Sequence, residues 1–269
     1  MSLREIKRFK IFFEFFFNIT KRREGFKDED LIKFWGNSKF SKNKKDSIKS
    51  KKKPISEEEK KLLIAKQKKK NLLCLKAANL GLFMCFYIRI IDPSKKKELV
   101  NILEKILNFD FLEYPLKLEN ELADSLDLGK GIAKNRALLD NLFTLFVCLN
   151  NKIPVFICGK AGCSKTLSFS LLFEGMKGEY SKSELFKKYP GLYVTSYQGS
   201  LTSSSSEIKT IFKRAKKVIS KQKDTKKNLS VILFDEMGLA EISPLNPLKV
   251  IHSELDGKQE VAFVGSSNF

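Results

Sequence analysis

The stretch Ile153–Thr166, which reads IPVFICGKAGCSKT, decides the fold of this 269-residue chain. The apolar run Ile153–Cys158 is a predicted β-strand, and an apolar helical pattern begins near Lys165. Between them lies a loop of small residues, whose backbone N–H groups can turn towards an anion beside the positive end of a helix. We therefore predict that this loop binds phosphate groups through Gly159, Lys160, Ala161, Gly162, Cys163, Ser164, Lys165 and Thr166.

Two side chains of this loop have predicted roles, and one residue departs from the usual pattern. The Lys165 ammonium is expected to contact the outer phosphates, and the Thr166 hydroxyl is expected to bind Mg²⁺. Ser164 stands where the pattern G-x-x-x-x-G-K-[ST] has its second glycine. Serine can keep the loop conformation if its φ is negative, so this departure weakens the pattern without cancelling it.

A second buried strand, Val231–Phe234, ends in two carboxylates. Asp235 is predicted to hold Mg²⁺, either directly or from the second coordination sphere, and Glu236 is predicted to orient and deprotonate an attacking water molecule. The last predicted strand leads to Asn268, whose amide would lie beside the γ-phosphate and that water. Lys165, Glu236 and Asn268 thus form the predicted catalytic set. For Asp235, Glu236 and Asn268 the alternative is a purely structural role, because polar side chains also occur at turns that end strands.

Strands alternate with helices from residue 131 onward. The strands are apolar along their whole length, which is typical of a parallel sheet covered by helices on both faces. Residues 57–130 read as mainly helical, with breaks at Asp92-Pro93 and near Tyr114-Pro115. The sequence therefore predicts an α/β P-loop nucleoside triphosphatase core at 131–269, incomplete at its C-terminus. It is preceded by a helical segment at 71–130 and a basic, partly helical tail or linker at 1–70.

Positive charge is concentrated in the first 70 residues. The chain has 51 Lys and Arg against 31 Asp and Glu, a net charge of +20, and residues 1–70 supply 23 of the basic and 10 of the acidic side chains. This distribution disfavours a uniformly basic nucleic-acid-binding domain. It leaves open a tether to nucleic acid or to an anionic membrane, in which Phe12, Phe13, Phe15, Phe16 and Phe17 would form an apolar face. Core packing is the competing and favoured interpretation of these phenylalanines.

Two apolar segments and the cysteines bear on the cellular compartment. Ile11–Ile19 and Ala77–Ile91 are each short of about 20 apolar residues, so we predict buried helices rather than membrane spans. Four of the five cysteines lie in apolar runs, which predicts reduced, buried thiols in a cytoplasmic protein. With no C-x-x-C pair and His252 as the one histidine, this sequence cannot build a zinc finger or RING domain.

The ordered motifs resemble those of AAA+ ATPases, and more closely those of the mysterin family of giant, dynein-like AAA+ RING ubiquitin ligases. The resemblance is carried by Gly131–Leu138 (GIAKNRAL), the loop Gly159–Thr166, Asp235–Glu241 (DEMGLAE) and Phe263–Asn268 (FVGSSN). In that family, one hydrolysis-competent module also lacks the glycine that Ser164 replaces. The likeness covers about residues 71–269 and is strong from 131.

The resemblance implies ATP and Mg²⁺ as ligands, ATP hydrolysis, neighbouring AAA+ modules in a ring, and ubiquitin-transfer machinery nearby. AAA+ modules continue into a fifth strand, an arginine finger and a helical lid, which this sequence lacks. We therefore expect a fragment that hydrolyses ATP weakly by itself. The alternative is a scaffold module that binds nucleotide without hydrolysing it.

Overall fold

A computed structural model describes residues 2–25, 57–220, 227–256 and 259–268. The chain divides into two compact units, one up to Tyr114 and one from Pro115 onward, and each is described by itself. The domain boundaries expected from the sequence, after residues 70 and 130, differ from this division and stay predictions. The lysine run at residues 39–53 lies outside the described residues.

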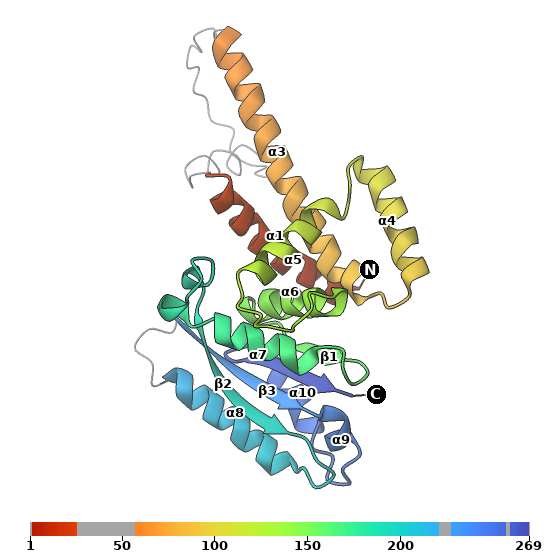
Figure 1. The fold of residues 1–269 in the computed structure, drawn as a ribbon, viewed down its shortest axis with the longest axis vertical. Helices are drawn as coiled ribbons and strands as arrows, with labels where there is room; N and C mark the ends of the chain where they lie inside the picture. The colour runs from red at the N-terminus through yellow and green to blue at the C-terminus, as the bar shows by residue number, and fades with distance from the viewer. Residues whose placement is uncertain (1, 26–56, 221–226, 257–258, 269) are drawn as a thin grey trace, which may run out of the picture. The chain divides into compact units, whose positions relative to one another are not determined.

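The first unit is helical, as the sequence predicts (Figure 1). Asp92 caps one of its helices and accepts a hydrogen bond from the Ser94 N–H at 2.8 Å, so the chain breaks at Asp92-Pro93 as predicted. The predicted break near Tyr114-Pro115 is the first turn of another helix, where proline removes no helical hydrogen bond. The elements are α1 (Leu3–Arg23), α3 (Glu57–Cys85), η1 (Tyr87–Arg89), α4 (Pro93–Leu107) and α5 (Glu113–Asp124), the last of which crosses the division between the units.

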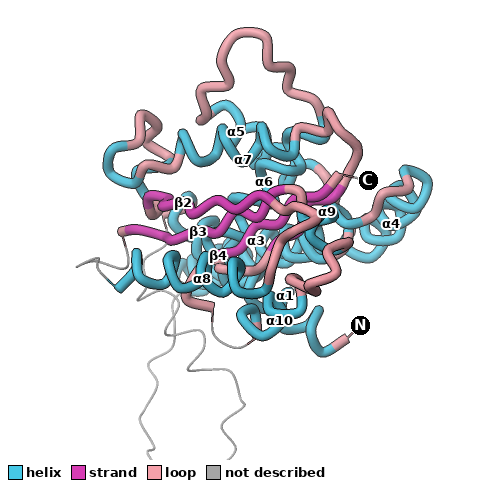
Figure 2. The backbone as a smooth tube through the Cα atoms, turned by 90° about the horizontal axis from the view of Figure 1, so that it is seen from below, coloured by secondary structure: helices cyan, strands magenta, loops and turns pink. Residues whose placement is uncertain are grey.

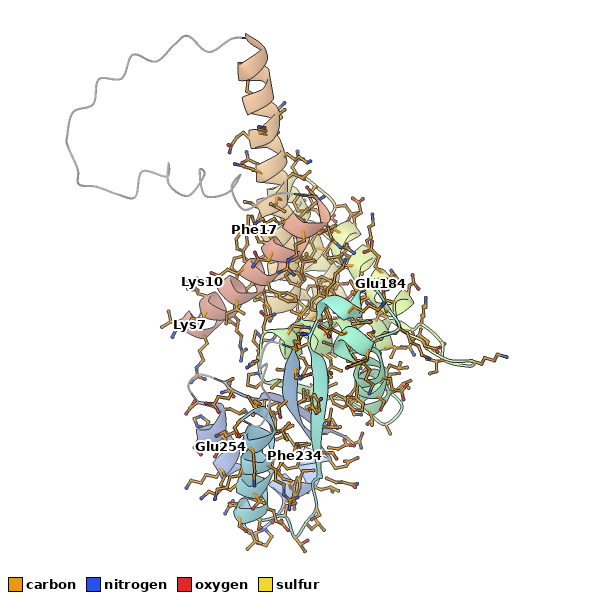
Figure 3. All side chains as sticks on the ribbon, turned by 90° about the vertical axis from the view of Figure 1, so that its left-hand side faces the viewer. Lys7, Lys10, Phe17, Glu184, Phe234 and Glu254 are labelled. Atoms are coloured by element: carbon orange, nitrogen blue, oxygen red, sulfur yellow. The ribbon has the colours of Figure 1, made fainter. Side chains whose placement is uncertain are left out.

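Helices α1 and α3 build the core of this unit with one apolar face each. Phe12 and Phe16 of α1 are buried, which confirms core packing for these two phenylalanines. Helix α3 buries Leu73, Ala77, Leu80 and Phe83. The helices approach closely at Gly81, where an added Cβ would lie 2.8 Å from the Phe9 ring. Lys7 and Lys10 project from the exposed side of α1 (Figure 3).

The helical stretch Ile64–Arg89 is long and apolar enough to cross a membrane by length and composition alone. It extends further upstream than the segment Ala77–Ile91 that the sequence pattern singled out. In its most apolar 18-residue window, 44% of the window is buried inside the protein. The core helix of a protein without a membrane span can show the same length and composition.

The second unit is built on a four-stranded sheet in which every pair of neighbouring strands is parallel. Its order is β1 (Val155–Cys158), β4 (Ala262–Ser267), β3 (Asn228–Asp235) and β2 (Gly191–Gln198). This confirms the predicted α/β fold with a parallel sheet. The other elements are α6 (Arg136–Asn150), α7 (Lys165–Gly175), η2 (Gly178–Tyr180), η3 (Phe186–Lys188), α8 (Ser205–Ser220), α9 (Met237–Glu241) and α10 (Lys249–Leu255).

Helices cover the sheet on both faces, with α6 and α7 on one side and α8 and α10 on the other (Figure 2). Alternate residues of β3 serve the two faces, because side chains of a strand point in opposite directions in turn. Ile232 and Phe234 pack in the cluster that includes Ile208 and Ala215 of α8. Leu233 and Asp235 therefore face the α7 side, where the loop Gly159–Thr166 lies.

Helix α8 begins with a reciprocal cap. The Ser204 N–H donates to Glu207 Oε2 at 2.8 Å, and the Glu207 N–H donates to Ser204 Oγ at 3.4 Å. Such a capping box satisfies two N–H groups that a helix start leaves unpaired. Near the C-terminal end of α8, Lys216 pairs with Glu254 of α10 at 2.7 Å.

A buried carboxylate joins α5 to α6. The Glu119 side chain is fully buried, and Arg136 donates hydrogen bonds to both Glu119 and Asp140. The second oxygen of Glu119, Oε1, has no hydrogen-bond partner among the described residues. Burial raises the pKa of Glu119 to about 7, against the opposing effect of the Arg136 charge.

This raised pKa makes the stability of the protein depend on pH. The folded state holds the Glu119 proton more tightly than the unfolded chain, whose pKa is near 4.5. The resulting stabilisation is fully present below about pH 4.5 and is lost as the pH rises through 7. Between pH 5 and pH 8, the wild-type free energy of unfolding should fall by about 2 kcal/mol more than that of Glu119→Gln. Urea denaturation measures this difference, with Glu174→Gln on the exposed side of α7 as the control. Equal pH dependence in wild type and Glu119→Gln would contradict the assignment.

Candidate functional site

The predicted phosphate loop joins the end of β1 to the start of α7, as the sequence indicates. Lys165, the first residue of α7, is buried, and its ammonium donates to the main-chain oxygens of Gly159 at 2.7 Å and Lys160 at 2.9 Å. Gly162 has a φ of +82°, which glycine adopts without strain. The loop therefore curls around the Lys165 ammonium, which can exchange these two carbonyl acceptors for phosphate oxygens.

Ser164 does not have the negative φ that a serine favours. Its φ is +57° and its ψ is +22°, so a serine occupies the left-handed region directly before α7. The condition of a negative φ at this position is therefore not met, and the serine takes a conformation that glycine adopts more readily. A left-handed conformation costs a residue with a Cβ about 1–2 kcal/mol.

The donors at this position fit a phosphate group. In the described chain, the backbone N–H groups of Ser164, Lys165 and Thr166 have no main-chain acceptor, as is usual at a helix start. Thr166 is exposed, and the Lys165 ammonium lies within the loop. Backbone donors, a cation and a hydroxyl together match the oxygens of a triphosphate and its metal.

Asp235 meets this loop across a small cavity. Lys165, Thr166, Asp235 and Ser266 all line the cavity, which has a volume of about 10 Å³. The Asp235 Oδ1 atom accepts hydrogen bonds from the Ser266 hydroxyl and, at 3.0 Å, from the Glu236 N–H. A threonine hydroxyl and a carboxylate are hard oxygen ligands of the kind that Mg²⁺ takes, so Thr166 and Asp235 could hold this ion.

Glu236 and Asn268 lie together at the carboxyl ends of β3 and β4. The Asn268 amide Nδ2 donates a hydrogen bond to Glu236 Oε1. Glu236 is left-handed, with a φ of +52° and a ψ of +43°. Gly199 makes room for this turn, because a Cβ there would lie 2.3 Å from the Glu236 main-chain oxygen. The structure therefore brings all the predicted site residues to one edge of the sheet.

Three contributors were missed by sequence reasoning. Ser266 received no role, although it follows Val264 by two residues and so shares the α7-facing side of β4. Gly199 could have been noticed, because a glycine directly after a strand often marks a close approach of two backbone segments. Asn141 contacts the loop through its side chain, and no sequence pattern marks this contact, because Asn141 lies within a helix 22 positions before Cys163.

Two of the four cysteines that lie in apolar runs, Cys74 and Cys158, are not fully buried as predicted. Cys85 and Cys148 are buried, Cys74 is half-buried, and Cys158 and Cys163 are exposed. Burial raises the pKa of the Cys85 thiol to about 11. Cys158 was expected to be buried but is exposed, since it ends β1 at the outer edge of the four-stranded sheet.

A larger cavity, of about 970 Å³, lies at the other end of the sheet, near the first residues of β2 and β3. Tyr180, Lys188, Gly191 and Asn228 are among the residues that line it, and none of the predicted site residues does so. Volume alone therefore does not identify the functional edge of this sheet, and the chemistry of the lining residues does.

The sequence model described as the RNF213 AAA domain matches residues 131–269, which include the loop, the acidic pair and Asn268. This chain belongs to the RNF213 AAA domain family. The resemblance to mysterin, another name for RNF213, is thereby confirmed, and an AAA domain implies nucleotide binding.

Relatives of this RNF213-type AAA domain include three named ubiquitin ligases. Human E3 ubiquitin-protein ligase RNF213 is 38% identical over 155 residues, which are 54% of this chain and 3% of the relative. The mouse protein of the same name is 37% identical over 147 residues, 51% of this chain and 3% of the relative. Zebrafish E3 ubiquitin-protein ligase rnf213-beta is 33% identical over 214 residues, 72% of this chain and 4% of the relative. The chain thus spans a small part of these proteins.

Proposed function

We propose that this AAA domain binds ATP with Mg²⁺ and hydrolyses it. The observation that carries the proposal is the meeting of Lys165, Thr166 and Asp235 at one small cavity. Loop N–H groups and the Lys165 ammonium bind the phosphates, while Thr166 and Asp235 hold the metal. Bound Mg²⁺ supplies positive charge that stabilises the transferred phosphoryl group.

Glu236 acts as the general base in this proposal. Asn268 donates to its Oε1 atom, and Oε2 accepts no hydrogen bond from the described residues. A carboxylate held at one oxygen can accept the proton of a water molecule at the other. The left-handed turn at Glu236 directs the carboxylate away from the direction it would take if β3 continued.

The alternative is a module that binds nucleotide and serves as a scaffold without turnover. The residues of the loop do not distinguish the ATPase from the scaffold, because the same loop binds ATP in both cases. An arginine finger supplied by a neighbouring module is typically worth about 10³–10⁵ in rate. The ATPase proposal therefore predicts that neighbouring modules accelerate hydrolysis, whereas the scaffold alternative predicts no turnover even when they are present.

The cellular setting follows from the relatives rather than from the site. We propose that the module works beside other AAA modules in a ring, within a cytoplasmic protein that also carries ubiquitin-transfer machinery. The names of the relatives, E3 ubiquitin-protein ligases, support this setting.

Equilibrium binding and single-turnover hydrolysis test the proposed function together. A fluorescent ATP analogue should bind the 269-residue chain, and EDTA should weaken the binding. Hydrolysis of radiolabelled ATP should be slow with this chain alone and should increase at least about a hundredfold in a chain extended by its neighbouring modules. Binding without any hydrolysis in the extended chain would favour the scaffold, and absence of binding in both chains would refute the site.

A further inference from the structure

Helix α6 contacts the phosphate loop through one polar side chain. The Asn141 Nδ2 atom donates a hydrogen bond to the main-chain carbonyl of Cys163, 3.0 Å away. The helix itself is firmly placed, since Asn135 caps its first turn and Leu138, Leu142 and Leu145 are buried. A fixed point outside the loop thus holds one peptide group within it.

The hydrogen bond from Asn141 fixes the direction of the Cys163 carbonyl and, through the same peptide group, that of the Ser164 N–H. The Cys163–Ser164 peptide is trans, so its C=O and N–H groups point in opposite directions. Because the C=O points to Asn141, the Ser164 N–H points away from α6. That N–H has no main-chain acceptor in the part of the chain that the structure describes, and it belongs to the loop whose donors fit a phosphate.

The same peptide group is joined to the residue with the unfavourable conformation. Serine at a φ of +57° would relax if this peptide plane rotated, whereas glycine would hold the same conformation without strain. Rotation would carry the Ser164 N–H out of its present direction. The bond from Asn141 opposes this rotation, since breaking it would leave the Cys163 carbonyl without that partner.

We propose that Asn141 is a positioning residue for phosphate binding, which holds the Cys163–Ser164 peptide so that the Ser164 N–H faces the phosphates. In this role it compensates for the glycine that the loop lacks. The inference rests on the proposed function, because it concerns the same loop. It assigns Asn141 no contact with the nucleotide.

A double-mutant cycle between Asn141 and Ser164 tests this inference. With a fluorescent ATP analogue and Mg²⁺, Asn141→Ala should weaken binding about fivefold to tenfold, the effect of losing one hydrogen bond. In the Ser164→Gly background the same change should weaken binding less than about twofold, since glycine keeps the conformation unaided. Asn141→Asp, which keeps the size but places an acceptor against the carbonyl, should weaken binding at least as much as alanine.

Matched controls separate positioning from a general structural effect. Asn150→Ala removes an amide of the same helix that bonds the Phe146 carbonyl within α6, and it should leave affinity unchanged. Thermal unfolding of each variant identifies any that fail to fold. If Asn141→Ala does not fold, Asn141→Asp replaces it, measured in the wild-type and in the Ser164→Gly background. No loss of affinity with Asn141→Ala, or an equal loss in both backgrounds, would overturn the inference. Lys165→Met, measured alongside, distinguishes this outcome from failure of the proposed function, which would leave Lys165→Met binding like wild type.

Discussion

Lys165→Ala is expected to abolish measurable ATP binding, with a loss of affinity of about a hundredfold or more. The Lys165 ammonium lies inside the loop, bonded to the Gly159 and Lys160 carbonyls, so it is held where phosphate oxygens would meet it. Hydrogen bonds to charged groups contribute about 1.5–3 kcal/mol each, and a triphosphate offers more than one acceptor to this group. Equilibrium titration with a fluorescent ATP analogue in the presence of Mg²⁺ measures the loss.

Two further variants make this result specific. Lys165→Met keeps the apolar stem of the buried side chain while removing its charge, so it should lose binding with less damage to the packing of α7. Lys209→Ala removes an exposed lysine of α8, which covers the other face of the sheet, and should bind like wild type. Wild-type affinity in both Lys165 variants would show that the phosphates bind elsewhere.

The fold was predictable from sequence because its signals are local and repeated. Apolar strands that alternate with helices specify a parallel sheet. The capping box of Ser204 and Glu207, a pattern readable in the sequence, lies at the start of α8. The order of the strands was not predictable in this way, since it depends on which strands pair across long connections. The exposure of Cys158 escaped prediction for the same reason, because an edge position is a property of the whole sheet.

The site was predictable to the extent that its chemistry lies in one segment or at strand ends. Carboxyl ends of parallel strands share one edge of a sheet, so Asp235 and Asn268 were expected near the loop. Asp235 lines the small cavity with Lys165 and Thr166, and Asn268 donates to Glu236, the residue that follows Asp235. The conformation of Ser164 was not predictable from its residue type, which favours the opposite sign of φ. Asn141 was hidden because a contact between side chain and main chain, 22 positions apart, leaves no pattern in the sequence.

Glu236→Gln is expected to separate binding from chemistry. Glutamine has nearly the same shape as glutamate, and its side-chain oxygen can still accept the hydrogen bond from the Asn268 amide. The affinity for ATP should therefore stay within about twofold of wild type. Glutamine cannot accept a proton from water at neutral pH, so single-turnover hydrolysis should fall by about 10²–10⁴-fold, the usual contribution of a general base.

The measurement belongs in a chain extended by the neighbouring modules that we propose, where wild-type turnover is expected to be fast enough to show such a loss. Glu241→Gln is the matched control, because Glu241 is an exposed glutamate at the end of α9, close in sequence to Glu236 and without a predicted role. It should hydrolyse ATP at the wild-type rate. If Glu236→Gln also kept that rate while binding ATP normally, another group would have to activate the water. If instead it lost binding, Glu236 would be acting on the nucleotide or the loop before any chemistry begins.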